Sequence, residues 1–129
     1  MRLLLDTHVL LWWLADDARL SKPARRLIAD VDNVVFVSAA SIWEIAIKAA
    51  LGRLKIDPTL LQPAIEESGF LSLPVSADHA VSVFNLPPLH SDPFDRMLIA
   101  QARAEQLKLV SCDARLSEYG VDMVERSQI

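Results

Sequence analysis

RLLLDTHVLL, residues 2–11, is the stretch that decides the fold. Arg2–Leu5 is a short, largely apolar run that predicts a buried strand, and Thr7–Leu14 predicts a helix because leucines recur on one face, at positions 10, 11 and 14. A strand that passes at once into a helix is typical of βαβ units with parallel strands. Asp6 then follows the carboxyl end of a strand, the edge at which open α/β sheets bind ligands.

The same alternation continues along the chain. Further strands are expected at Val34–Val37, Phe70–Leu73, Lys108–Cys112 and Val121–Val124. Three further helices are expected to span residues 40–51, 58–68 and 93–106. Two others are expected to begin at Ser21–Pro23 and after a cap at Ser76, and a short helical turn is expected at 114–118. We therefore expect an α/β fold: a single domain over residues 1–129 with a mainly parallel central sheet of about five short strands, flanked by helices.

Composition limits the class of protein. The chain has 129 residues, of which 52% are hydrophobic and 23% charged, which predicts one well-packed domain. Its single cysteine, Cys112, excludes an internal disulfide and a cysteine-rich zinc site, and we expect it in the core. Asp6 and His8 interrupt the first apolar run, so we interpret it as strand and helix, not as a targeting segment. No run reaches the roughly 18 apolar residues of a membrane span, and we expect a cytoplasmic protein.

The net charge is −4, from 13 basic and 17 acidic residues. Nucleic-acid-binding domains usually have more basic than acidic residues, so this charge balance is evidence against nucleic-acid binding. It does not exclude one, because a bound divalent cation would cancel part of the negative charge where acidic residues gather.

Two acids occupy equivalent positions after strands. Asp6 and Asp113 each leave an apolar run and enter a helical turn. Carboxylates brought together repel each other unless a cation neutralises them, and oxygen ligands suit Mg²⁺ or Mn²⁺. For Asp6, a helix N-cap is an equally good and compatible interpretation. The neighbouring hydroxyls of Thr7 and Ser111 could support a metal-bound water, or could be local caps.

Glu44 lies between apolar neighbours in the segment SAASIWEIAIK, residues 38–48. One interpretation is a capping box, in which Ser41 begins the helix and Glu44 folds back onto its amide. The other places Glu44 one turn into a helix that follows the strand Val34–Val37, facing the same sheet edge as Asp6.

DPFDR, residues 92–96, is the segment richest in charged residues. Asp92 directly before a proline predicts an N-cap. Asp95 then falls in the first helical turn, where the helix dipole favours an acid and where a metal ligand would also lie. We expect Arg96 to form an exposed salt bridge with one of these acids, with phosphate binding as the alternative.

The aromatic and histidine residues give weaker signals. The three histidines lack metal-ligand spacing, and we expect them to be structural or solvated: His8, His79 and His90. The three tryptophans are expected in packing or at an interface: Trp12, Trp13 and Trp43. No glycine-rich phosphate-binding loop is present.

Four segments together resemble a known family. LLLDTHVLLWWL (3–14), VSAASIWEIAIK (37–48), DPFDRMLIAQA (92–102) and LVSCD (109–113) are similar, in this order, to the four acidic motifs of PIN-domain ribonucleases, and most of all to VapC-type toxins of bacterial type II toxin–antitoxin pairs. The family's acids then fall on Asp6, Glu44, Asp95 and Asp113, with Asp92 as a frequent extra acid. The resemblance implies a Mg²⁺- or Mn²⁺-dependent endoribonuclease, commonly a homodimer, that a small cognate antitoxin holds inactive.

The chemistry implied by this resemblance is hydrolysis of a phosphodiester bond. Asp6, Asp95 and Asp113 would be direct or water-mediated ligands of one or two cations, about 3.5–4 Å apart if there are two. Glu44 would be a ligand or would orient the attacking water. Cations at this position would lower the pKa of the water and neutralise charge in the transition state.

Other functions remain open. A DNA-directed nuclease would use the same ligands, which do not distinguish the sugar. A catalytically silent PIN-fold scaffold would be expected to have lost some of the acids, and this chain keeps four. A phosphotransfer receiver domain also gathers acids at strand ends, but it would need a late lysine, and none follows Asp113.

Overall fold

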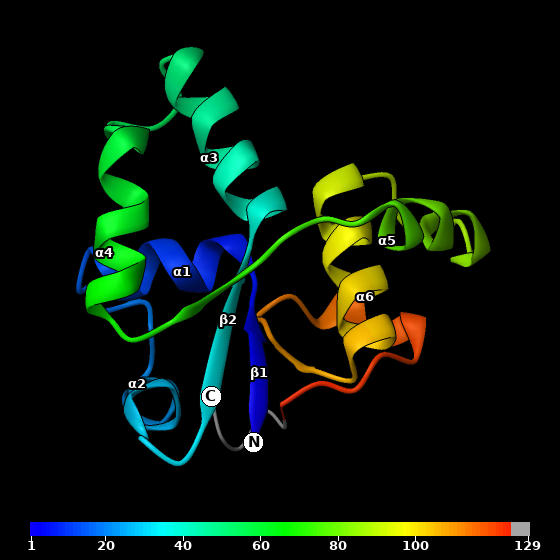
Figure 1. The fold of residues 1–129 in the computed structure, drawn as a ribbon, viewed down its shortest axis with the longest axis horizontal. Helices are drawn as coiled ribbons and strands as arrows, with labels where there is room; N and C mark the ends of the chain where they lie inside the picture. Colours follow the sequence, from blue (N-terminus) through cyan, green and yellow to red (C-terminus); the bar gives the residue numbers. More distant parts are fainter. Residues whose placement is uncertain (125–129) are drawn as a thin grey trace.

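The structure, a computed structural model, describes residues 1–124 and centres on a parallel four-stranded sheet in the order β3-β2-β1-β4 (Figure 1). The strands are β1 (Arg2–Leu5), β2 (Val34–Ser38), β3 (Leu71–Leu73) and β4 (Lys108–Val110). The predicted parallel α/β architecture is confirmed.

The fifth predicted strand, Val121–Val124, forms only an isolated parallel bridge, between Leu109 and Met123. Two backbone hydrogen bonds flank it, from Leu109 N to the Asp122 carbonyl and from Val124 N to the Leu109 carbonyl. Because β4 has only three residues, it offers a short edge, and this segment pairs with it at one point.

Helices connect and cover the strands. They are α1 (Thr7–Leu14), α2 (Lys22–Ala29), α3 (Ala39–Ala50), α4 (Leu61–Glu67), α5 (Ala77–Ser82) and α6 (Pro93–Glu105), with the 3₁₀ helices η1 (Pro58–Leu60), η2 (Val83–Asn85) and η3 (Ala114–Tyr119). Serine hydroxyls cap several of them as predicted: Ser21 accepts from Ala24 N, and Ser76 accepts from His79 N. Within residues 1–124, no helix combines the length and the apolarity that crossing a membrane requires.

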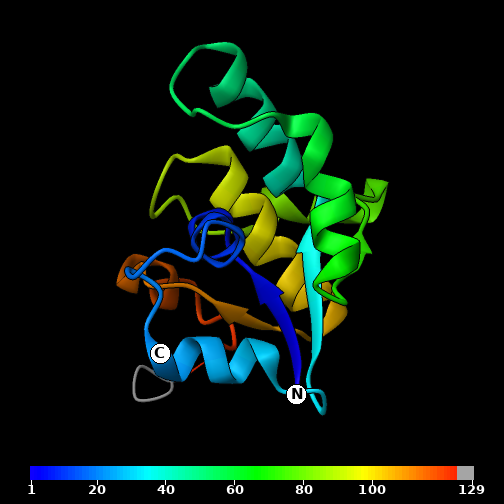
Figure 2. The ribbon, with the colours of Figure 1, turned by 90° about the vertical axis from the view of Figure 1, so that its left-hand side faces the viewer.

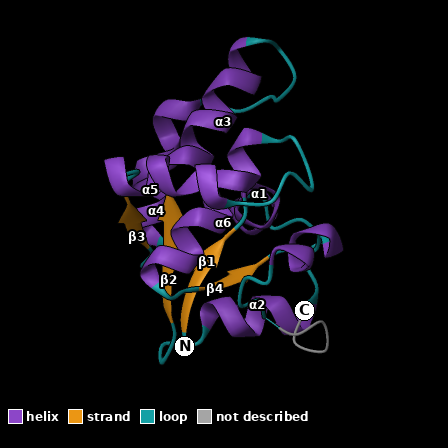
Figure 3. Ribbon diagram, turned by 90° about the vertical axis from the view of Figure 1, so that its right-hand side faces the viewer, coloured by secondary structure: helices purple, strands orange, loops and turns teal. Residues whose placement is uncertain are grey.

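Successive side chains of β1 point to opposite faces of the sheet and so belong to two separate core clusters. Leu3 and Leu5 pack in a cluster with residues of α1, α2 and α4, whereas Leu4 packs in a cluster with residues of α6 and η3. Figure 2 looks onto the side that carries α2 and α4, and Figure 3 onto the side that carries α5 and α6. The sheet is therefore covered on both faces, as a buried parallel sheet requires.

The strand order reverses between β1 and β4. The chain moves outward from β1 through β2 to β3, and then returns to place β4 on the other side of β1. A hydrogen bond of 3.1 Å from Asp6 N to the Val110 carbonyl ties the ends of these two strands together. Ligands of open α/β sheets bind at such a reversal, beyond the carboxyl ends of the strands. Asp6 and Asp113 both follow strands that end there.

Candidate active site

Asp6 has both of its carboxylate oxygens engaged. It caps α1 by accepting a 2.8 Å hydrogen bond from Val9 N on Oδ1, and the hydroxyl of Ser111 donates to Oδ2. The carboxylate is buried, and burial raises its pKa, although the bonds from Ser111 and Val9 oppose the rise. The charge of Asp113 raises it further. The N-cap interpretation is thus confirmed, and the cap places the acid at the β1–β4 edge.

Asp113 lies beside it in a more exposed position. Its carboxylate accepts from Arg115 N at 3.0 Å as the N-cap of η3, and forms a two-pronged ion pair with the Arg115 guanidinium, with Nη2–Oδ2 at 2.7 Å. The hydrogen bonds from Arg115 hold the pKa of Asp113 below its usual range. Asp113 N in turn donates to the Ser111 hydroxyl at 3.0 Å, so Ser111 links the two acids.

Asp95 is the acid most affected by its neighbours. It lies in the first turn of α6 with a side chain that is 22% exposed. Burial first, and then the charges of Asp92, Asp6 and Glu44, raise its pKa to about 6, against the opposing effect of His90. Acids at the starts of α1 and α6 and within α3 therefore act together on the pKa of Asp95.

Asp92 is the predicted N-cap of α6. Its Oδ1 accepts from Phe94 N at 2.9 Å and from Asp95 N at 3.2 Å. The cap fixes the start of the helix and so fixes where Asp95 lies.

Glu44 is buried in the middle of α3, with 4% of the residue exposed. The capping-box interpretation is wrong, because α3 begins at Ala39 and its N-cap is Ser38, whose hydroxyl accepts from Ala40 N. Glu44 instead binds Lys48 one turn later, with Oε2 2.7 Å from Nζ. The hydroxyl of Thr7 donates to Ser41 at 3.0 Å and not to an acid, so Thr7 supports the packing of α1 against α3.

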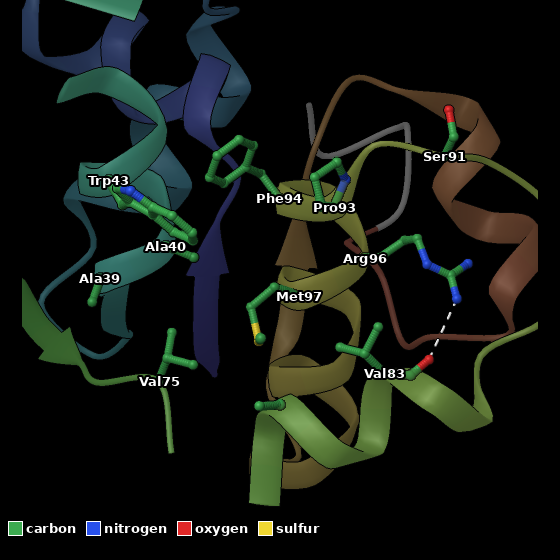
Figure 4. Close-up of a pocket in the computed structure, with 11 residues that line it drawn as sticks. Ala39, Ala40, Trp43, Val75, Val83, Ser91, Pro93, Phe94, Arg96 and Met97 are labelled. Atoms are coloured by element: carbon green, nitrogen blue, oxygen red, sulfur yellow. Dashed lines mark hydrogen bonds between the residues drawn. The ribbon is translucent and has the colours of Figure 1, made fainter. Parts of the chain in front are cut away.

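The prediction that Arg96 pairs with an acid of its own segment is wrong. Its guanidinium donates to the carbonyl oxygens of the segment before α6 and to the hydroxyl of Tyr119, and these acceptors are Val83, Leu86, Pro87, His90 and Tyr119 (Figure 4 shows the bond to Val83). Five donors on a planar group suit this role, which holds the connection to α6 in place.

Three functional candidates were missed from the sequence: Lys48, His90 and Arg115. His90 is 9% exposed, and its Nε2 lies 3.3 Å from Oδ2 of Asp95 without a hydrogen-bond partner among residues 1–124. The other two are the partners of Glu44 and Asp113. The i,i+4 spacing of Glu44 and Lys48 is a signal that could have identified one of them. The other histidines behave as expected: His8 is exposed, and His79 caps α5.

Two hollows adjoin these residues. A cleft of about 460 Å³ is lined by Glu44, Lys48, His90, Asp92 and Arg115, together with Ser91, Pro93 and Phe94. An apolar groove of about 560 Å³, shown in Figure 4, runs between the start of α3, α5 and α6. The rings of Trp43 and Phe94 meet edge to face at its end, with centroids 5.3 Å apart. Cys112, predicted in the core, is exposed.

The donor set fits a hard divalent cation, although the side chains do not yet converge. Within the described residues, no three His, Cys, Asp or Glu side chains are placed to hold one metal ion. Glu44 and Asp113 are turned toward Lys48 and Arg115 instead. Burial is the first cause of the raised pKa values of Asp6 and Asp95, and a cation bound beside these carboxylates would favour their charged forms. Oxygen ligands of this kind suit Mg²⁺ or Mn²⁺.

Comparison with known proteins gives consistent results. Residues 3–122 match the PIN domain. The chain is 35% identical to Ribonuclease VapC22 of Mycobacterium tuberculosis over 120 residues, which cover 90% of each chain. In fold it is similar to the VapBC2 structure from Rickettsia felis bound to a promoter DNA fragment, with a TM-score of 0.70, 16% identity and coverage of 97% and 98%. It is also similar to a toxin–antitoxin complex from Klebsiella pneumoniae, with a TM-score of 0.56, 17% identity and 85% of each chain covered.

Proposed function

The chain belongs to the PIN-domain family, and from that premise we propose that it is a divalent-metal-dependent endoribonuclease acting as the toxin of a toxin–antitoxin pair. The observation that carries the proposal is the environment of Asp95. Burial, and then the charges of Asp92, Asp6 and Glu44, raise the pKa of Asp95 to about 6. Such an arrangement is unfavourable in the apo protein and becomes favourable when a cation is bound.

Each acid has a distinct part in this proposal. Asp6, Asp95 and Asp113 would hold Mg²⁺ or Mn²⁺, and Glu44 would complete the ligand set or orient the attacking water. The bound cation would supply an activated water and charge neutralisation at the phosphorus. Ser111 holds Asp6 in place through its hydroxyl, and Asp92 holds Asp95 in place through its cap on α6. These contacts fix the positions of Asp6 and Asp95, and a bound cation would draw Glu44 and Asp113 from Lys48 and Arg115 toward them.

The test is cleavage of matched RNA and DNA single strands by the purified protein in Mg²⁺, in Mn²⁺ and in chelator. We expect cleavage of RNA in either metal and none in chelator. Cleavage of DNA alone would favour the DNA-directed alternative. If neither RNA nor DNA is cleaved in either metal, and circular dichroism shows that the protein is folded, the binding-scaffold alternative is favoured.

We also propose a cognate antitoxin that inserts a basic side chain among the acids. The chain itself provides the motivation, because Glu44 and Asp113 already form ion pairs with the basic side chains of Lys48 and Arg115. An arginine from a partner can satisfy a carboxylate in the same two-pronged manner, and it would exclude the cation. The ribonuclease relative and the toxin–antitoxin neighbour support the existence of such a partner.

The partner is tested by finding whether a gene for a small protein adjoins the gene of this chain, and by co-expressing the two proteins. The purified complex should be inactive, and proteolysis of the partner should restore RNA cleavage. A stable complex that cleaves RNA at the full rate would contradict blocking of the acids, while leaving the nuclease proposal intact.

A further inference from the structure

An acidic chain that acts on RNA needs cations where the substrate lies. The net charge is −4, and the four acids of the site repel a polyanion. Most of the affinity of proteins for nucleic acid comes from Lys and Arg contacts to phosphates. The relevant cations must therefore be on the walls of the cleft itself.

Lys48 lies on one wall of the cleft, on α3. Its side chain is 36% exposed, and its Nζ contacts Glu44 at 2.7 Å. An ammonium group has three donors, and this bond uses one of them. Lys48 can thus keep its bond to Glu44 and still donate to a phosphate oxygen in the cleft.

Arg115 lies in η3 and lines the same cleft. Its side chain is 68% exposed, and its hydrogen bonds to Asp113 use Nε and Nη2. None of the bonds described for residues 1–124 uses Nη1. Arg115 lines the same cleft as Glu44 and Asp92, so its guanidinium lies near the acids of the site and not only near Asp113.

We propose that Lys48 and Arg115 bind backbone phosphates of the RNA substrate on either side of the scissile bond. This inference rests on the proposed nuclease function for the identity of the substrate. The geometry supports the rest of the proposal. The two basic side chains line the cleft of about 460 Å³, as Glu44 and Asp92 do, and each has N–H donors that its acidic partner does not use. Phosphate contacts position a strand without reading its sequence.

The chain contains a matched control for Arg115. Asp17 and Arg19 repeat the i,i+2 ion pair, with Nη2–Oδ2 at 2.7 Å and an arginine side chain that is 70% exposed. This second pair lies in the connection between α1 and α2, and it does not line the cleft. Arg19→Gln therefore removes the same charge and the same type of bond away from the proposed contact.

The experiment measures binding of a fluorescein-labelled, 20-nucleotide random-sequence RNA by anisotropy, in chelator, over a range of salt concentrations. Each phosphate contact to a single strand contributes about 0.7 to the slope of log K against log salt. We expect Arg115→Gln to reduce the magnitude of this negative slope by about 0.7, and Arg115→Gln combined with Lys48→Gln to reduce it by about 1.4. Arg19→Gln should leave the slope unchanged. Lys48→Arg should keep the wild-type slope, because the charge remains.

The outcomes separate this inference from the proposed function. An unchanged slope in Arg115→Gln, or an equal decrease in Arg19→Gln, overturns the phosphate contacts even if the wild-type protein cleaves RNA in Mg²⁺. The predicted slopes without any cleavage in Mg²⁺ support the contacts and overturn the nuclease proposal. If Lys48→Gln fails to fold because Glu44 loses its partner, the comparison of Arg115→Gln with Arg19→Gln decides alone.

Discussion

Ser111 donates its hydroxyl hydrogen bond to Oδ2 of Asp6, although the two residues are 105 positions apart in the chain. The bond spans the ends of β4 and β1, where the strand order reverses. It opposes the rise in the pKa of Asp6 that burial causes, and so favours the charged form that a cation would need.

Ser111→Ala should weaken the affinity for Mg²⁺ by about 10–100-fold, because residues that orient a metal ligand typically have effects of this size. The measurement is the Mg²⁺ concentration that gives half-maximal RNA cleavage. Ser117→Ala is the control, since Ser117 donates to the Ala114 carbonyl in the neighbouring η3 and touches no acid of the site. Equal half-saturation in the two variants would show that Ser111 has no supporting part.

Asp95→Asn and Asp92→Asn separate a proposed ligand from a cap. Asn is about as good an N-cap as Asp, so Asp92→Asn should preserve α6 and cost little activity. Asp95→Asn removes a charge from the crowded acids, and should lower cleavage at saturating Mg²⁺ by orders of magnitude. Its melting temperature without metal should be unchanged or higher, because repulsion is relieved. Wild-type activity in Asp95→Asn would remove Asp95 from the ligand set.

The raised pKa of Asp95 predicts how apo stability depends on pH. The folded state binds the Asp95 proton more tightly than the unfolded chain does, since the pKa rises from 3.8 to about 6. The resulting stabilisation is complete at acid pH and is lost as the pH rises through this interval. In chelator, the melting temperature of the wild-type protein should therefore fall relative to that of Asp95→Asn between these two pH values. A constant difference across the interval would contradict the raised pKa.

We expect a homodimer. The chain is 52% hydrophobic and exposes large apolar side chains at Trp43 and Phe84, which are 64% and 91% exposed. Light scattering at micromolar concentration should give about twice the 14.3 kDa chain mass. Phe84 lies in η2 next to Val83, which lines the apolar groove, and Phe84→Ser should shift the mass toward the monomer. A monomer for the wild-type protein at every concentration would show that this prediction is wrong.

Local signals in the sequence predicted most of the fold. Apolar runs located the four strands, and serine or aspartate residues located the starts of α1, α2, α5 and α6, because both signals depend on near neighbours. The predicted helix 40–51 begins one residue after the observed start of α3 at Ala39, and the cap is Ser38, three positions before the Ser41 of the capping-box interpretation.

The acids of the site were predicted, but their basic partners were not. Strand ends identify where a carboxylate lies, whereas the direction of a flexible arginine or lysine depends on the folded surroundings. Arg96 illustrates the limit. Asp92 and Asp95 are close to it in the sequence, yet its guanidinium donates to carbonyl oxygens of η2 and of the segment that follows η2. His90 lies in the same loop, and its contact with Asp95 follows from the turn of the chain and not from spacing.

The caps at Asp6 and Asp113 have a consequence for how the gene can change over time. Each of these residues begins a helix through a side-chain oxygen, a part that asparagine performs about as well. Aspartate and asparagine codons differ by one base. A single point mutation at either position would thus yield a protein that keeps its shape and its surface but has lost a charge at the centre of the site. If the proposed function holds, an inactive variant that still binds the proposed antitoxin is therefore one point mutation away from this chain.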